Sequence, residues 1–128
     1  MEIYITGVNA GNATYKPIVL ANNGGTPGSD LATLNFKTAA SYPGWDATNL
    51  SSYGITVNSD FFVGLKYDGT NKPIYGYDTG DNGRAWDFDG SSWTTYPQTY
   101  FMRATIQTTT SVAEISNEIP KAFELSFI

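Results

Sequence analysis

Short alternating apolar runs, each ended by turn residues, repeat along most of this chain and restrict its fold more than any other feature. In residues 60–67, Phe61, Val63 and Leu65 fall on one face of an extended strand. Turns every roughly 8 to 12 residues are typical of a two-sheet sandwich. We therefore predict an all-β fold, an antiparallel β-sandwich of jelly-roll type that is nearly free of helix. A closed barrel is the alternative, because period-2 patterns do not separate the two.

The predicted strands cover residues 2–6, 14–21, 31–38, 45–50, 60–67, 74–77, 84–88, 93–96 and 100–109, the last being the longest. In the first strand, Ile3 and Ile5 share one face and Tyr4 takes the other. Pro17 indicates that the second strand lies at an edge or carries a bulge, because proline has no N–H for the ladder. The Asn and Gly residues of segments 7–12 and 22–28 indicate a break and a loop.

Composition excludes several functional classes. A length of 128 residues suits one compact domain, and the absence of His and Cys removes Ser-His-Asp and Cys-His catalysis and the usual zinc sites. A net charge of -5 with seven scattered basic residues argues against a nucleic-acid partner. No run of about 18 apolar residues predicts a membrane span. Charged residues make up only 15%, below the roughly 25% of average chains, and this favours an extracellular β-protein.

Acidic residues concentrate between positions 68 and 89. Asp78, Asp81, Asp87 and Asp89 are the candidate ligands of a calcium ion, which prefers six to eight oxygens. The favoured interpretation is that these residues stabilise turns through their own backbone, with calcium as the alternative and no other cofactor expected. Asp87 and Asp89 project from one face of a strand, so a carboxylate pair of the glycosidase kind is a third and weaker hypothesis.

Aromatic residues are more numerous than a domain of this size needs for its core. Trp86, Trp93, Tyr96 and Tyr75, with Arg84, are the candidate ligand-binding residues, because flat rings stack on sugars and their polar tips hydrogen-bond at a wet surface. The competing interpretation places each single ring in the core. The two arginines, at positions 84 and 103, are expected to pair with aspartates of the acidic segment, with a ligand clamp as the alternative.

Four segments occur in an order that resembles a known class of module: NNGGTPGSDL (22–31), ITVNSDFFVG (55–64), NGRAWDF (82–88) and YFMRA (100–104). They resemble a β-sandwich accessory module of secreted bacterial multidomain proteins, often peptidases. Further on, IPKAFELS (119–126) is similar to the connector that precedes a C-terminal sorting domain of the type IX secretion family, whose own core motif is absent. The resemblance implies an accessory module over residues 1–109 and, over residues 110–128, a connector toward a missing sorting domain. Residues 122–128 alternate in polarity and are a candidate extra edge strand.

These observations predict a non-catalytic accessory module that acts outside the cell or at its surface. Its most specific form is a carbohydrate-binding module whose partner is a polysaccharide. The alternative is a structural or protein-contact spacer that touches a neighbouring domain of the parent protein and has no small ligand. No nucleic-acid partner and no membrane span are expected.

Overall fold

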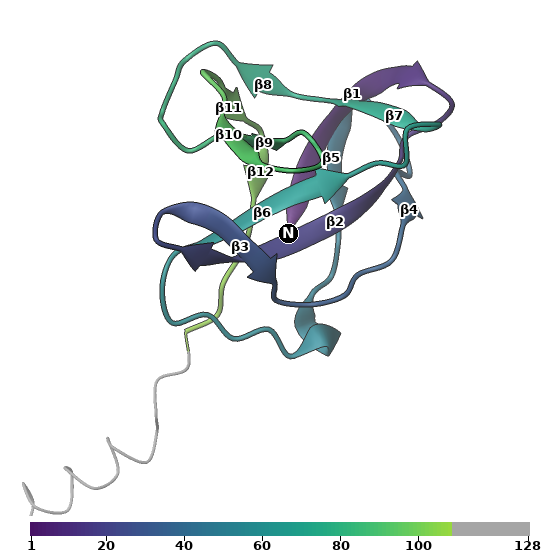
Figure 1. Cartoon of the computed structure of the whole chain (residues 1–128). Coiled ribbons are helices and arrows are strands. Elements are labelled where there is room, and N and C mark those ends of the chain that lie inside the picture. The colour runs from purple at the N-terminus through teal and green to yellow at the C-terminus, as the bar shows by residue number, and fades with distance from the viewer. Residues whose placement is uncertain (109–128) are drawn as a thin grey trace, which may run out of the picture.

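The computed structural model describes residues 1–108, which form an all-β structure with antiparallel pairing throughout (Figure 1). The elements are β1 (Glu2–Ala10), β2 (Thr14–Asn23), β3 (Thr26–Asp30), β4 (Lys37–Thr38), β5 (Gly44–Ala47), the 3-10 turn η1 (Ser51–Tyr53), β6 (Phe61–Lys66), β7 (Lys72–Tyr75), β8 (Tyr77–Asp78), β9 (Trp86–Phe88), β10 (Trp93–Thr95), β11 (Thr99–Tyr100) and β12 (Met102–Arg103). The all-β antiparallel prediction is confirmed, and the jelly-roll connectivity stays a prediction. Nothing in this part of the chain is a helix long and apolar enough to cross a membrane.

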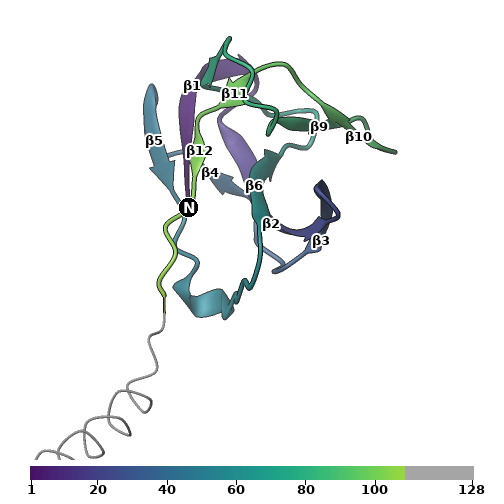
Figure 2. The same ribbon diagram turned by 90° about the vertical axis from the view of Figure 1, so that its left-hand side faces the viewer.

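Two four-stranded sheets are each built around one long strand. β1 pairs with β5, β7 and β12, while β2 pairs with β3, β4 and β6. Figure 2 shows β1, β5 and β12 on one side of the molecule and β2, β3 and β6 on the other, as in a sandwich. Two short ribbons, β9 with β10 and β8 with β11, complete the structure at one end.

The core lies between the two long strands. Ile3 and Ile5 of β1 are buried, as their alternation predicts, together with Ala13, Tyr15 and Ala39 from the other layer. Burying such side chains contributes roughly 1.5–3 kcal/mol each to folding. The core is small, so a polar contact between the layers also helps to hold them together.

A buried polar cluster joins the layers. The hydroxyl of Tyr15 on β2 donates to Oδ2 of Asp46 on β5, and Nζ of Lys37 on β4 lies 2.9 Å from the same oxygen. Burial raises the pKa of the Asp46 carboxyl, but the hydrogen bonds from Tyr15 and Lys37 outweigh it and hold the pKa below its ordinary value. The cluster therefore favours the charged form of Asp46 in the folded protein.

Three distant chain segments meet in a ring of backbone hydrogen bonds. The N–H of Tyr4 donates to the carbonyl of Phe101 (3.0 Å), that of Phe101 to Gly76 (2.9 Å), and that of Gly76 to Tyr4 (2.7 Å). The Tyr4 ring also packs edge-on against the Phe101 ring. This junction ties β1 to the segment between β7 and β8 and to the segment between β11 and β12.

Several predicted strand limits were wrong. Residues 26–30 form β3, although the predicted loop extended to residue 28 and the next predicted strand began at residue 31. The reason is a two-residue hairpin turn between Asn23 and Thr26, in which Gly24 and Gly25 both have positive φ. The predicted strand 31–38 is reduced to β4. The predicted break at 7–12 begins later, because β1 continues to Ala10 along β7.

The last predicted strand, residues 100–109, is also shorter than expected. It is split at Phe101, because the segment pairs with β8 at Tyr100 and then with β1 from Met102 onward. Pro17 agrees with its prediction: β4 pairs with residues 14 and 15 of β2 and β3 with residues 20 to 23, so within the described chain Pro17 has a partner strand only in β6. The predicted connector over 110–128 and the candidate edge strand at 122–128 lie outside the described residues.

Candidate functional site

A groove whose lining includes five tyrosines, here called the tyrosine groove, lies where β7, β8 and β11 approach the β9–β10 hairpin. It encloses about 290 Å³. The residues that line it are five tyrosines (Tyr67, Tyr75, Tyr77, Tyr96 and Tyr100), the polar residues Asn9 and Gln98, the charged residues Lys72 and Asp87, and Pro73 and Ile74. Aromatic walls with a few polar groups are typical of small-ligand sites.

The tyrosine rings hold one another at defined angles. The rings of Tyr75 and Tyr100 meet edge to face, with centroids 5.1 Å apart and planes at 85°. The rings of Tyr96 and Tyr100 stack at 6.0 Å and 18°. Tyr96 and Tyr77 are exposed, at 41% and 51% of their surface. The groove thus offers rings to solvent while the contacts between them limit their movement.

Asp87 is the only acidic residue that lines this groove. It comes from β9 and is half-buried, and its Oδ1 accepts a hydrogen bond from the Tyr100 hydroxyl at 2.7 Å. Burial and this bond raise the pKa of Tyr100 above its usual range. Burial, followed by the negative charge of Asp87, also raises the pKa of Tyr75. Both tyrosines therefore remain neutral hydroxyl groups beside a carboxylate.

The β9–β10 hairpin separates the predicted site residues onto two faces. Trp86 and Phe88 share one face of β9, Asp87 takes the other, and Trp93 lies directly opposite Phe88 on β10 with ring centroids 5.0 Å apart. Trp86, Trp93 and Arg84 do not line the groove. Of the predicted ligand-binding residues, the structure therefore brings Tyr75 and Tyr96 to the groove and leaves the other three outside it.

Three of the four aspartates predicted as calcium ligands bond to separate turns, and the fourth, Asp87, lies on β9. Asp78 accepts from the N–H of Gly80, and Asp81 from the N–H of Gly83. Asp89 accepts from the N–H groups of Ser92 and Ser91, which lower the pKa of its carboxyl to about 2. Within residues 1–108, no three acidic side chains gather as a group that could hold a metal ion. The turn interpretation is confirmed for Asp78, Asp81 and Asp89 and is wrong for Asp87, which accepts from Tyr100, while calcium binding stays a prediction.

The arginine pairing differs from the expectation. Arg103 pairs with Glu2, with Nε 2.7 Å from Oε2, and its guanidinium lies 4.0 Å from the centroid of the Trp45 ring. The described residues show no ion pair for Arg84. The acidic segment between positions 68 and 89 thus receives no arginine partner within this part of the chain.

Sequence reasoning missed several groove residues. Tyr67, Tyr100, Gln98 and Asn9 were not proposed, and Asp87 was proposed only as a metal ligand or a member of a carboxylate pair. One signal was available: Tyr75 and Tyr77 fall two apart, and Tyr96 and Tyr100 four apart, in a chain whose strands are too short to bury them all. Their meeting depends on long-range pairing of β8 with β11, which no local pattern reveals.

Comparison of the chain with protein families, curated proteins and solved structures found no match.

Proposed function

We propose that this chain is a non-catalytic, extracellular carbohydrate-binding module and that the tyrosine groove holds the sugar. The observation that carries this proposal is the convergence of five tyrosines with Asp87, Gln98 and Asn9 on one depression. A sugar ring has an apolar face that stacks on tyrosine and hydroxyl groups that exchange hydrogen bonds with carboxylate and amide oxygens. The groove is lined both by tyrosine rings and by side chains with carboxylate and amide oxygens, which supports the proposal.

A non-catalytic role accords with the acidic content of the groove. Glycoside hydrolysis generally uses two carboxyl groups on either side of the scissile bond. Asp87 is the single carboxylate among the residues that line the groove, and Asp89 is engaged in its own turn. The composition and the resemblance to accessory modules of secreted proteins support an extracellular location.

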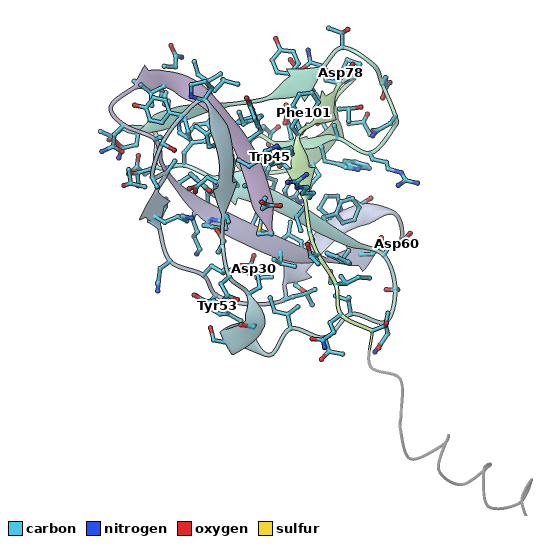
Figure 3. All side chains as sticks on the ribbon, turned by 180° about the vertical axis from the view of Figure 1, so that it is seen from behind. Asp30, Trp45, Tyr53, Asp60, Asp78 and Phe101 are labelled. Carbon is cyan, nitrogen blue, oxygen red and sulfur yellow. The ribbon has the colours of Figure 1, made fainter. Side chains whose placement is uncertain are left out.

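The experiment is a binding screen of the protein against soluble and insoluble polysaccharides, followed by calorimetry on any ligand found. Tyr96→Ala removes an exposed groove ring and is expected to weaken binding at least about fivefold, since stacking of a planar group on one aromatic ring is worth roughly 1–3 kcal/mol. Tyr53→Ala is the matched control, because Tyr53 is a similarly exposed ring in η1, at the end of the molecule away from Phe101 and Asp78 (Figure 3). Equal loss in both variants, or no binding to any polysaccharide, would contradict the proposal.

A second candidate is a protein-contact spacer, favoured by an apolar surface beside the groove. Tyr4, Ile74, Tyr77 and Phe101 line a smaller depression, and Ile74 is 42% exposed although it is aliphatic. A contact surface of this kind predicts that Ile74→Ser lowers the melting temperature of a longer parent chain and leaves that of the 128-residue chain unchanged. Carbohydrate binding predicts no such difference.

A further inference from the structure

We propose that the groove selects a sugar unit that carries a protonated amino group, such as the glucosamine units of a deacetylated polysaccharide. This inference rests on the proposed carbohydrate-binding function and adds the chemical class of the ligand. It is drawn from the charge at the centre of the groove and from the rings that surround that charge.

The first observation is a carboxylate without a cationic partner. Asp87 is half-buried, and its Oδ1 is bonded to the neutral hydroxyl of Tyr100. No Lys or Arg of residues 1–108 forms an ion pair with it, whereas Asp46 pairs with Lys37 and Glu2 pairs with Arg103. A partly desolvated negative charge is stabilised by a cation, so a ligand ammonium group has a place beside Asp87.

The second observation is the set of aromatic rings around that carboxylate. Tyr75 stands perpendicular to Tyr100, Tyr96 stacks on Tyr100, and all three residues line the groove with Asp87. The negative faces of aromatic rings attract ammonium groups, and such attraction is strongest where water is partly excluded. The same rings stack on a pyranose. An amino sugar satisfies both properties, while a neutral sugar uses only the second.

Lys72 is the other charged residue that lines the groove, and its effect on the affinity for a cationic ligand is opposite to that of Asp87. Lys72, at the start of β7, is exposed and lines the groove without pairing to Asp87. Its positive charge opposes a cationic ligand through the intervening solvent. Removing this charge is therefore expected to strengthen the binding of an amino sugar.

The size of the groove suits a short stretch of ligand. About 290 Å³ lies just below the roughly 300–1,000 Å³ that small-ligand sites occupy. A single sugar unit can therefore make the decisive contacts. Acetylation of its amino group would replace the ammonium by a neutral amide, which removes the charge that Asp87 is proposed to recognise.

The experiment compares three oligosaccharides of equal length by calorimetry at about pH 5.5, where an amine stays protonated: oligomers of glucosamine, of N-acetylglucosamine and of glucose. We expect the glucosamine oligomer to bind at least about tenfold more tightly than the other two. Asp87→Asn keeps the size of the side chain and an acceptor for Tyr100, and is expected to reduce this preference to less than about threefold. Lys72→Gln is expected to increase the affinity for the glucosamine oligomer.

The control is Asp60→Asn, which removes one negative charge from an exposed position well separated from Asp78 and Phe101 in Figure 3. It should leave the preference unchanged. Because Asp87→Asn could also disturb folding, the wild-type protein supplies a second measurement: its affinity for the glucosamine oligomer should fall as salt is raised, and its affinity for the glucose oligomer should not.

The outcomes separate the two proposals. Equal affinity for all three oligomers overturns the amino-sugar inference and leaves carbohydrate binding in place. Absence of binding to any saccharide overturns the proposed function, and the inference with it. Binding of tetramethylammonium without binding of any saccharide would show a cation site of another kind and would likewise overturn the inference.

Discussion

Gly76 occupies a position with no room for a side chain. A Cβ at this residue would lie 2.8 Å from Cδ2 of Phe101 and 3.0 Å from Cδ1 of Tyr4, closer than side chains pack. Gly76→Ala must therefore displace one of the two rings and strain the backbone ring of hydrogen bonds that Gly76 shares with them. We expect a loss of about 1–3 kcal/mol in the free energy of unfolding, measured with urea. Gly7→Ala is the control, because nothing lies near its Cβ, and a comparable loss there would contradict this explanation.

Asp46 gives the folded protein a specific dependence on acid. Its pKa in the folded state lies below the ordinary 3.8, so its contribution to stability is complete above that value and is lost as pH falls through the lower folded pKa. Asp46→Asn is expected to cost about 1–3 kcal/mol at pH 7. The difference between variant and wild type should shrink below about pH 4. Urea midpoints over this range provide the measurement, and a difference that stays constant with pH would count against the assignment.

For single residues, the sequence predicted the local role of a side chain better than its contacts with distant parts of the chain. It correctly favoured turn-bound aspartates, because these depend on local chemistry: Asp81 and Asp89 bond backbone groups two or three residues away. It did not reveal that Asp87 faces Tyr100, or that Asp46 serves the sheet interior. Those contacts join residues on strands that are separate in the chain.

The β9–β10 hairpin is the element on which the groove depends most directly. Its turn is held by the Asp89 carboxylate, which binds the N–H groups of Ser91 and Ser92, and Asp87 lies two residues before it. Asp89→Ala is therefore expected to increase the hydrogen-exchange rates of the Ser91 and Ser92 amides and to weaken ligand binding, although residue 89 does not line the groove.

In the wild-type protein, the Ser91 and Ser92 amides should lose protection from hydrogen exchange as pH falls from about 4 to 2. This is the interval between the ordinary pKa of an aspartate and the lowered pKa of Asp89.

For that hairpin, Asp81→Ala is a suitable control, because it removes an equivalent turn carboxylate outside the hairpin. It should leave the Ser91 and Ser92 amides unchanged. Unchanged exchange in Asp89→Ala would show that the strand pairing alone holds the turn.

The sequence predicted strands well where apolar and polar residues alternate along the whole strand. It predicted them poorly where a segment leaves one neighbouring strand and pairs with another. The first half of β1 follows the period-2 pattern, while β6 is half-buried on both faces, and both strands begin within one residue of their predicted starts. The segment from Tyr100 to Arg103 also alternates, yet it leaves β8 for β1 at Phe101 and so forms two short strands. Alternation reports which face is buried and carries no information on which strand lies beside it.

For the whole molecule, we expect stability to depend little on calcium. Three of the four aspartates predicted as ligands already accept hydrogen bonds from their own turns, and the fourth bonds Tyr100. A ligand that binds only the folded state raises stability by mass action. Replacing about 1 mM calcium with EDTA should therefore shift the melting temperature by less than about 2 °C. A larger fall would place a calcium site ahead of the turn interpretation.

The pairing of Glu2 with Arg103 has a consequence for how the molecule is made. The two residues lie 101 positions apart, yet they sit side by side where β1 meets β12. A chain that emerges from a ribosome or an export channel with its N-terminus first would present β1 long before β12 exists. Its first sheet would stay open-edged until almost the whole module had emerged, and folding governed by such distant pairings takes milliseconds to seconds. Synthesis thus passes through a stage in which the nascent β1 edge needs protection from other chains.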